Sequence, residues 1–103
     1  MTLYSHGTQP TTPINIGGIV HTSAVSAANI ARDIRENIRN LTGGKMEHYE
    51  RLIDKTVARA FEKLEQQASD AGYDGVVGVT VTHPVVVDGG VEVIVYGNGF
   101  HYQ

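Results

Sequence analysis

The sequence contains no cysteine and no tryptophan, and it has no long apolar run. Without cysteine the chain cannot form a disulfide framework, a thiolate metal site or a cysteine nucleophile. No segment approaches the roughly 20 consecutive apolar residues that a membrane-spanning helix needs. Residues 1–13 have neither the basic start nor the apolar stretch of a secretory signal, so we expect a cytoplasmic protein.

An excess of basic residues is also absent. The net charge is −3, from 8 Lys and Arg against 11 Asp and Glu. Proteins that bind nucleic acid normally present a basic face, so this balance argues against that class. The sequence also lacks the Gly-x-Ser-x-Gly, His-Glu-x-x-His and phosphate-loop motifs of well-known catalytic sites. An enzyme whose site is completed between subunits is therefore the least favoured function.

The length and composition are those of one small domain. A chain of 103 residues with a hydrophobic fraction of 41% has room for a single core. Residues 1–13 are polar and show no period, which predicts a flexible N-terminal arm. We expect the single domain to occupy residues 14–103.

Three segments have the β-branched composition of strands, namely 14–25, 76–82 and 91–100. Gly17 and Gly18 lie inside the first segment, where glycines usually mark a bulge or a close backbone approach. The Asp-Gly-Gly turn at 88–90 is suited to a hairpin between the other two segments. Pro84 interrupts the strand pattern there, so the sequence leaves two pairings of these strands possible, which differ by one residue.

Two amphipathic helices are predicted between the first and second strands. Apolar residues recur at steps of three and four over 27–41, and again over 45–71 without an interrupting Gly or Pro. Gly43-Gly44 would end the first helix and Gly72 the second. The second helix would be about 40 Å long, whereas a strand over 76–82 spans only about 24 Å. Part of its apolar stripe should therefore overhang the sheet and need another surface.

Alternation along the last two strands predicts two different sheet faces. The face that suits the helix carries the valines Val77, Val79, Val81, Val91, Val93 and Val95. The other face carries Thr80, Thr82, Glu92, Ile94, Tyr96 and Phe100. Such apolar and aromatic residues are unusual on a sheet that faces only water, so this face also favours self-association. The alternative is a monomer in which the first helix or the N-terminal arm covers it.

Three separated motifs resemble one known family. They run from Asn29 to Asn40 with Gly43-Gly44 and Tyr49 following, from Ala71 to Val79, and from Glu92 to Gly97. Their order and spacing are similar to those of the YbjQ-like family, small proteins often labelled "putative heavy-metal-binding domain". The resemblance spans 18–100 and implies an α+β fold: a β-α-β-β, dodecin-like subunit with a long amphipathic helix on an antiparallel sheet. It also implies a homo-oligomeric ring, typically a pentamer or a multiple of it.

The polar positions that match these motifs are the candidate ligand or interface residues, namely Asn29, Arg32, Asp33, Asn40 and Tyr49. They would line the contact between subunits, either as interface hydrogen-bonding groups, which we prefer, or as a pocket for a small ligand. The sequence implies no cofactor. It predicts a ring-forming protein of unknown function with an assembly or ligand-binding role at its subunit interfaces.

Metal-ion binding is the alternative function. The 5 histidines are the only imidazole ligands in the chain, and zinc needs three or four ligands at about 2.0–2.2 Å. No two histidines have the spacing that clamps a metal from a single helix or strand. A ring would have to bring His21 or His83 from several subunits together on its axis. Dispersed surface histidines are the simpler interpretation.

Overall fold

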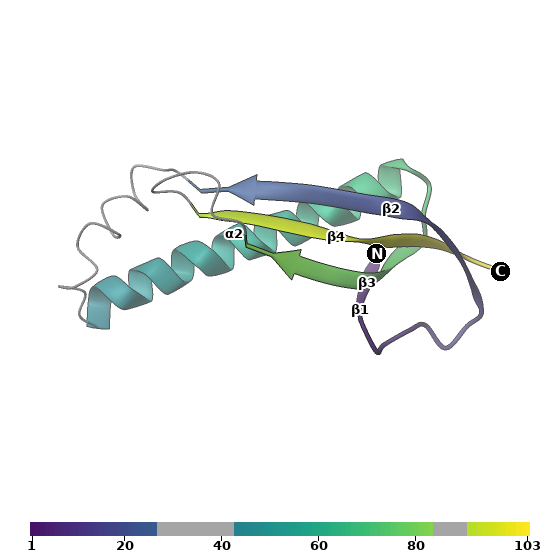
Figure 1. Ribbon diagram of the computed structural model, residues 1–103, viewed down its shortest axis with the longest axis horizontal. Helices are drawn as coiled ribbons and strands as arrows, with labels where there is room; N and C mark the ends of the chain where they lie inside the picture. Colours follow the sequence, from purple (N-terminus) through teal and green to yellow (C-terminus); the bar gives the residue numbers. More distant parts are fainter. Residues whose placement is uncertain (27–42, 84–90) are drawn as a thin grey trace.

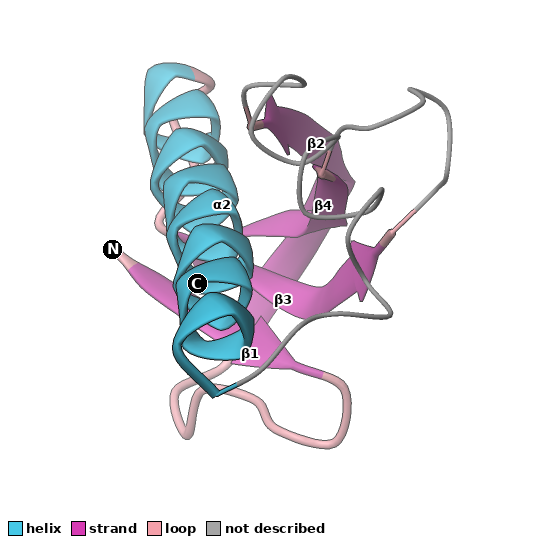
Figure 2. Cartoon of the chain, turned by 90° about the vertical axis from the view of Figure 1, so that its left-hand side faces the viewer, coloured by secondary structure: helices cyan, strands magenta, loops and turns pink. Residues whose placement is uncertain are grey.

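The computed structural model describes residues 1–26, 43–83 and 91–103. The elements in this part of the chain are strands β1 (Thr2–Ser5), β2 (Ile14–Val25), β3 (Gly75–Thr82) and β4 (Glu92–Tyr102), and helix α2 (Gly43–Asp70). The helix lies along one face of a four-stranded sheet (Figures 1 and 2). The helix predicted over 27–41 and the turn predicted at 88–90, with Pro84, lie outside the described residues.

The sheet is mixed, with the strand order β1-β3-β4-β2. Strand β4 pairs antiparallel with both β2 and β3, as the predicted β-α-β-β order requires. Strand β1, however, pairs in parallel with β3. The prediction of a purely antiparallel sheet is therefore wrong, because Thr2–Ser5 of the predicted N-terminal arm join the sheet as a parallel edge strand.

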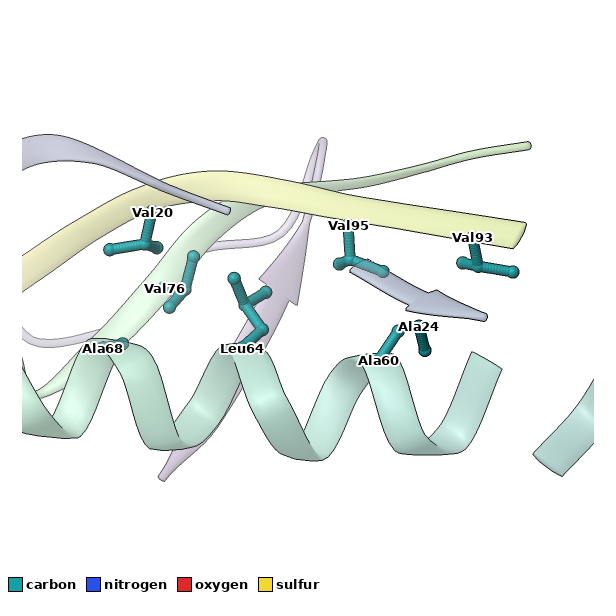
Figure 3. Packing of buried hydrophobic residues seen from close by; sticks show 8 residues of the cluster. All are labelled: Val20, Ala24, Ala60, Leu64, Ala68, Val76, Val93 and Val95. Carbon is teal, nitrogen blue, oxygen red and sulfur yellow. The ribbon is translucent and has the colours of Figure 1, made fainter. Parts of the chain in front are cut away.

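The long helix is confirmed close to its predicted limits, since Gly43–Asp70 replaces 45–71. Its apolar stripe buries Ala60, Leu64 and Ala68, none of which is exposed. These side chains point at valines of three strands (Figure 3), among them Val20 and Val95. The periodicity of three and four in the sequence thus places one helix face on the sheet, and this contact forms the core of the protein.

The helix ends at Gly72 for a conformational reason. Gly72 has a φ of 86°, a left-handed conformation that side-chain-bearing residues adopt only with strain. Its N–H donates to the carbonyl of Ser69 at 3.0 Å, and the N–H of Tyr73 donates to that of Ala68, also at 3.0 Å. This pair of hydrogen bonds is a Schellman cap. The cap turns the chain and brings the ring of Tyr73 against the core.

The N-terminal part of α2 extends past the ends of the strands (Figure 1). The first buried side chain among those described on the helix is that of Thr56, so about 20 Å of helix precedes it at 1.5 Å per residue. The radius of gyration is 16.4 Å, against about 13 Å for a compact chain of this length. The sequence-based expectation that the helix outgrows the sheet is confirmed for the described elements.

Two bulges flank β4. The register between β2 and β4 shifts between Ile16 and Ile19, at Gly17-Gly18, as their glycines predict. A second shift, between Val77 and Thr80, coincides with Gly78, which has a φ of 65°. This shift was not predicted.

The second bulge corrects the predicted sheet faces. Val76 rather than Val77 lies in the core beneath the helix, while Val79 packs against that core as predicted. Val77 points to the other side, where it lines a small cavity with His6 and Asn98. The prediction was wrong for Val77 because the extra residue at Gly78 exchanges the two faces of β3 at that point.

Phe100 lies on the side predicted for it, but it is completely buried. Its ring centroid is 6.1 Å from that of Tyr4 on β1 and 5.4 Å from that of Tyr102. Gly75 on β3 leaves space for it, since a Cβ there would come within 2.5 Å of the ring. Tyr4 of the N-terminal strand therefore packs against Phe100 at this end of the second sheet face.

No helix in the described ranges is long and apolar enough to cross a membrane.

Candidate functional site: an open sheet face and a strand edge

The side of the sheet away from α2 is called the open face below. A row of polar and aromatic side chains crosses it, because cross-strand pairing places His21 on β2 beside Tyr96 on β4, and Tyr96 beside Thr80 on β3. The imidazole of His6 extends the row, with its Nε2 3.0 Å from Thr80 Oγ1. Four side chains from separate parts of the chain thus form one line across the sheet.

Large apolar side chains are exposed on the same face. Ile16 is 63% exposed, Ile19 72% and Tyr96 40%. Scattered apolar residues are normal on a protein surface, but a group on one sheet face marks a contact surface. Tyr4 of β1 packs against Phe100, whereas these three side chains stay exposed. Within the described residues, the open face is therefore covered only at the end that holds Phe100.

Strand β2 is an edge of the sheet, and its outward backbone groups can be identified. Residues of an antiparallel pair alternate between facing the partner strand and facing away from it. The N–H of Ser26 donates to the carbonyl of Val91 at 2.9 Å, so Ser26 faces β4. The alternate residues Ile19, His21, Ser23 and Val25 therefore direct their N–H and C=O groups away from the sheet.

Two basic side chains of α2 cover part of this edge. Lys63 Nζ donates to the carbonyl of Ser23, and Arg59 Nη2 donates to the carbonyl of Val25. Among the described side chains, none donates to the outward carbonyls of Ile19 and His21. Uncovered backbone groups on an edge strand are a ready partner for another strand. Within the described ranges, this edge is thus blocked at its Val25 end and open around Ile19 and His21.

A groove lies at the opposite edge of the sheet, between α2, β1 and β3. It has a volume of about 630 Å³, and its apolar lining includes Leu3, Phe61, Val79 and Val81. Glu65 of α2 contributes the charged group to its wall. Val81 is 44% exposed, although it lies on the helix side of the sheet. This edge therefore also presents apolar surface.

The polar residues predicted for a ligand or interface site cannot be placed. Asn29, Arg32, Asp33 and Asn40 fall within 27–42, outside the described residues. Tyr49 lies on α2, but its side chain is outside the described part of the structure. Their role at a subunit interface stays a prediction from the sequence.

The two candidate metal ligands lie on different parts of the sheet. His21 is exposed in the row on the open face. His83 follows the end of β3, where its Nδ1 is 3.0 Å from the carbonyl oxygen of Glu92. Within the ranges that the structure describes, no three His, Asp or Glu side chains converge as a metal site would require. A single subunit therefore does not bring these histidines together.

Sequence reasoning missed Arg59 and Lys63. The sequence did contain a signal for them. They are four residues apart on a predicted helix, so both lie on the same side of its apolar stripe. That spacing is common on solvent-exposed helix faces, however, and only the structure shows that this side borders an edge strand.

The described residues form a small α+β protein in which helix α2 lies on a four-stranded mixed sheet with β1 and β2 as its edge strands. The chain belongs to the YbjQ family, whose description reads "Putative heavy-metal-binding" and whose model matches residues 1–102. A UPF0145 protein of Halobacterium salinarum is 36% identical over 80 residues, which cover 78% of this chain and 77% of that one. A UPF0145 protein of Halorubrum lacusprofundi is 35% identical over the same shares. The family is one of unknown function.

A solved structure supports the fold. A crystal structure of a protein of unknown function from Pediococcus pentosaceus, assigned to the DUF74 family, superposes with a TM-score of 0.69. The match covers 100% of this chain and 98% of that chain at 20% sequence identity. At this identity the likeness concerns the fold alone.

Proposed function

We propose that the protein acts as a subunit of a homo-oligomeric ring, with an assembly or ligand-binding role at the contacts between subunits. The observation that carries this proposal is the uncovered apolar surface of the open face, where Ile16 and Ile19 are 63% and 72% exposed. At about 25 cal/mol per Å² of buried apolar area, covering such side chains stabilises an assembly substantially. A second copy supplies a surface of the same kind.

The overhanging part of α2 adds to this argument. Leu52 and Ile53 lie before the first buried helix residue, yet both are only partly exposed. A helix in isolation gains little stability from its own hydrogen bonds and depends on packing of its apolar face. Contacts between subunits would provide that packing for the part of α2 that the sheet does not reach.

The oligomeric state of the full chain tests this proposal. Native mass spectrometry and light scattering at micromolar concentration should give one closed species, with five copies of the 11.1 kDa chain, or a multiple of five, as the expected number. Polar residues alternate with apolar ones along the strands, so a monomer should stay in solution and be detected if it forms. A chain that remains monomeric at that concentration contradicts the proposal.

Metal-ion binding is the second candidate, because the family description names it and His21 is exposed on the open face. Since the described residues of one chain hold no three converging ligands, this function would need His21 from several subunits. Zinc titration of untagged protein, followed by elemental analysis, should then show binding to the ring and none after His21→Ala. His101→Ala is the matched control, because His101 is also exposed but lies apart from the row, with its ring centroid 5.0 Å from that of Tyr73. Absence of zinc binding by the wild-type ring removes this candidate.

A further inference from the structure

A small cavity lies on the open face, beside the loop that follows β1. Its volume is about 210 Å³, below the roughly 300–1,000 Å³ of sites for drug-sized ligands, so it suits a molecule of few atoms. The loop contributes His6 to the lining, β3 contributes Val77 and β4 contributes Asn98. No Asp, Glu, Lys or Arg is among the described residues that line it. Because a charged ligand would find no opposite charge there, the cavity favours an uncharged one.

A tight turn holds His6 at this cavity. The N–H of Thr8 donates to the carbonyl of Ser5 at 3.2 Å, and Gly7 has a φ of 82°, as the third residue of a type II turn requires. His6 is the second residue of that turn. A Cβ at Gly78 would lie 3.7 Å from Cε1 and 4.0 Å from Nδ1 of His6. The edge of the imidazole that carries Nδ1 therefore faces the bulge of β3.

The hydrogen bonds of Thr80 determine which nitrogen of His6 is free. The Thr80 hydroxyl donates its only hydrogen to the carbonyl of Gly78 at 3.2 Å. Its oxygen lies 3.0 Å from Nε2 of His6 and can only accept there, so Nε2 carries the hydrogen. A neutral imidazole has one N–H, which leaves Nδ1 as a bare acceptor. Among the described residues, no group donates to this nitrogen.

Asn98 supplies a second polar group whose orientation is fixed. Its Nδ2 donates to the carbonyl of Gly17 at 3.3 Å, and Oδ1 is then its free acceptor. Val77, the cross-strand neighbour of Asn98, is only 8% exposed and gives the cavity an apolar wall. A few placed polar groups beside apolar surface are typical of a small-molecule site.

We propose that this cavity binds a small uncharged molecule that donates hydrogen bonds, of the kind that a primary amide represents. One N–H of the molecule donates to Nδ1 of His6 and another to Oδ1 of Asn98, while its apolar part lies against Val77. Thr80 is a positioning residue, because its hydroxyl holds the imidazole with the acceptor nitrogen free. Every group of the site comes from one chain, so this inference goes beyond the proposed ring and does not depend on it.

A first experiment compares two probes that differ in hydrogen-bond donors. Benzamide joins an amide N–H₂ group to a compact apolar ring, and methyl benzoate has a similar size and shape but no N–H or O–H. We expect ligand-observed NMR titrations of the wild-type chain, at mildly alkaline pH, to show that benzamide binds roughly tenfold more tightly, the effect of one hydrogen bond. Equal affinity for the two probes, or no benzamide binding at millimolar concentration, overturns the proposal.

A second experiment removes the acceptor. His6→Phe keeps an aromatic ring but has no ring nitrogen, so benzamide should bind roughly tenfold more weakly while methyl benzoate binds as before. Circular dichroism shows whether the variant is folded. Wild-type affinity for benzamide in a folded His6→Phe protein contradicts the proposed site.

A third experiment tests the positioning residue and leaves His6 in place. Thr80→Val removes the acceptor of the Nε2 hydrogen and should weaken benzamide binding several-fold, whereas Thr80→Ser keeps the hydroxyl and should bind as the wild type does. Thr82→Val is the matched control, because Thr82 lies on the same face of β3 and does not line the cavity. Equal effects of the two valine variants contradict the proposal, and this comparison decides the matter if His6→Phe does not fold.

The outcomes separate this inference from the proposed function. A monomeric wild type that binds benzamide selectively removes the ring and supports the cavity. A wild-type ring that binds both probes equally leaves the ring standing and overturns the cavity alone.

Discussion

The hydroxyl of Tyr73 accepts a hydrogen bond of 2.9 Å from the backbone N–H of Gly18. The ring that carries this hydroxyl lies directly on Gly17 and Gly99, where a Cβ would collide with it. The Schellman cap at Gly72 places Tyr73 in this position. The end of α2, the bulge in β2 and Gly99 of β4 thus form one structural unit.

The glycines under Tyr73 should be intolerant of even one methyl group. We expect Gly99→Ala to lower the free energy of unfolding by about 1–3 kcal/mol, because the new Cβ would overlap the Tyr73 ring. Gly18→Ala is the matched control, since its Cβ would meet only the Tyr73 hydroxyl oxygen at 3.4 Å. Urea denaturation at one fixed protein concentration measures both. Equal losses for the two variants would show that the close approach of the ring is not the cause.

The effect of substitutions at Gly78 on stability should depend on its backbone conformation and not on the room available for a side chain. A Cβ at Gly78 would have the His6 ring 3.7 Å away as its nearest neighbour, an ordinary contact. The φ of 65° is nevertheless unfavourable for side-chain-bearing residues. Gly78→Ala should therefore cost about 1–2 kcal/mol of stability, while the larger Gly78→Asn should cost less, because asparagine tolerates this conformation. If asparagine is the more damaging in thermal unfolding, crowding governs the position instead.

Local sequence patterns were sufficient for the elements that carry the core. The apolar residues of α2 recur over seven turns, and the glycines in β2 identify its bulge, because both features depend on residues close together in the chain. β1 has no such pattern. Thr2–Ser5 form a strand only because β3, more than seventy residues later, offers an edge. Pairing of that kind cannot be recognised from the four residues themselves.

The exchanged face of Val77 has a comparable origin. Valines at 77, 79 and 81 have the alternation of a regular strand, and a single residue in a left-handed conformation at Gly78 breaks it. The candidate site was less predictable than the fold because it depends on contacts between residues far apart in the sequence. Whether Lys63 is an ordinary surface lysine or covers a strand edge depends on the carbonyl of Ser23, forty residues away in the sequence.

The core should be most sensitive at the middle of the helix–sheet contact. Leu64 is completely buried among the valines in Figure 3, whereas Leu52 on the overhanging part of α2 is only partly buried. Leu64→Ala should cost about 2–5 kcal/mol, since it leaves a cavity in addition to the lost burial. Leu52→Ala should cost clearly less in the same urea titration. Comparable losses would mean that the overhanging part is packed as tightly as the core.

A pair of buried hydroxyls should be energetically coupled. Ser26 is 8% exposed and Thr56 1%, and their hydroxyl oxygens are in hydrogen-bond contact. Thr56 Oγ1 donates to the carbonyl of Leu52 at 2.7 Å, so the Ser26 hydroxyl must be the donor to Thr56. Thr56→Val keeps the shape of the side chain but leaves Ser26 without its acceptor, which should cost about 1–3 kcal/mol.

Ser26→Ala completes a double-mutant cycle for this pair. On its own it should cost less than Thr56→Val, because Thr56 keeps its hydrogen bond to Leu52. Once Ser26 is alanine, Thr56→Val no longer leaves a buried donor unpaired. The double variant should therefore lose less unfolding free energy than the two single variants added together, by about 0.5 kcal/mol or more. Urea denaturation of the four proteins, at one concentration, gives the coupling energy. Simple additivity would show that the two hydroxyls contribute independently and that the contact does not stabilise the junction of β2 with α2.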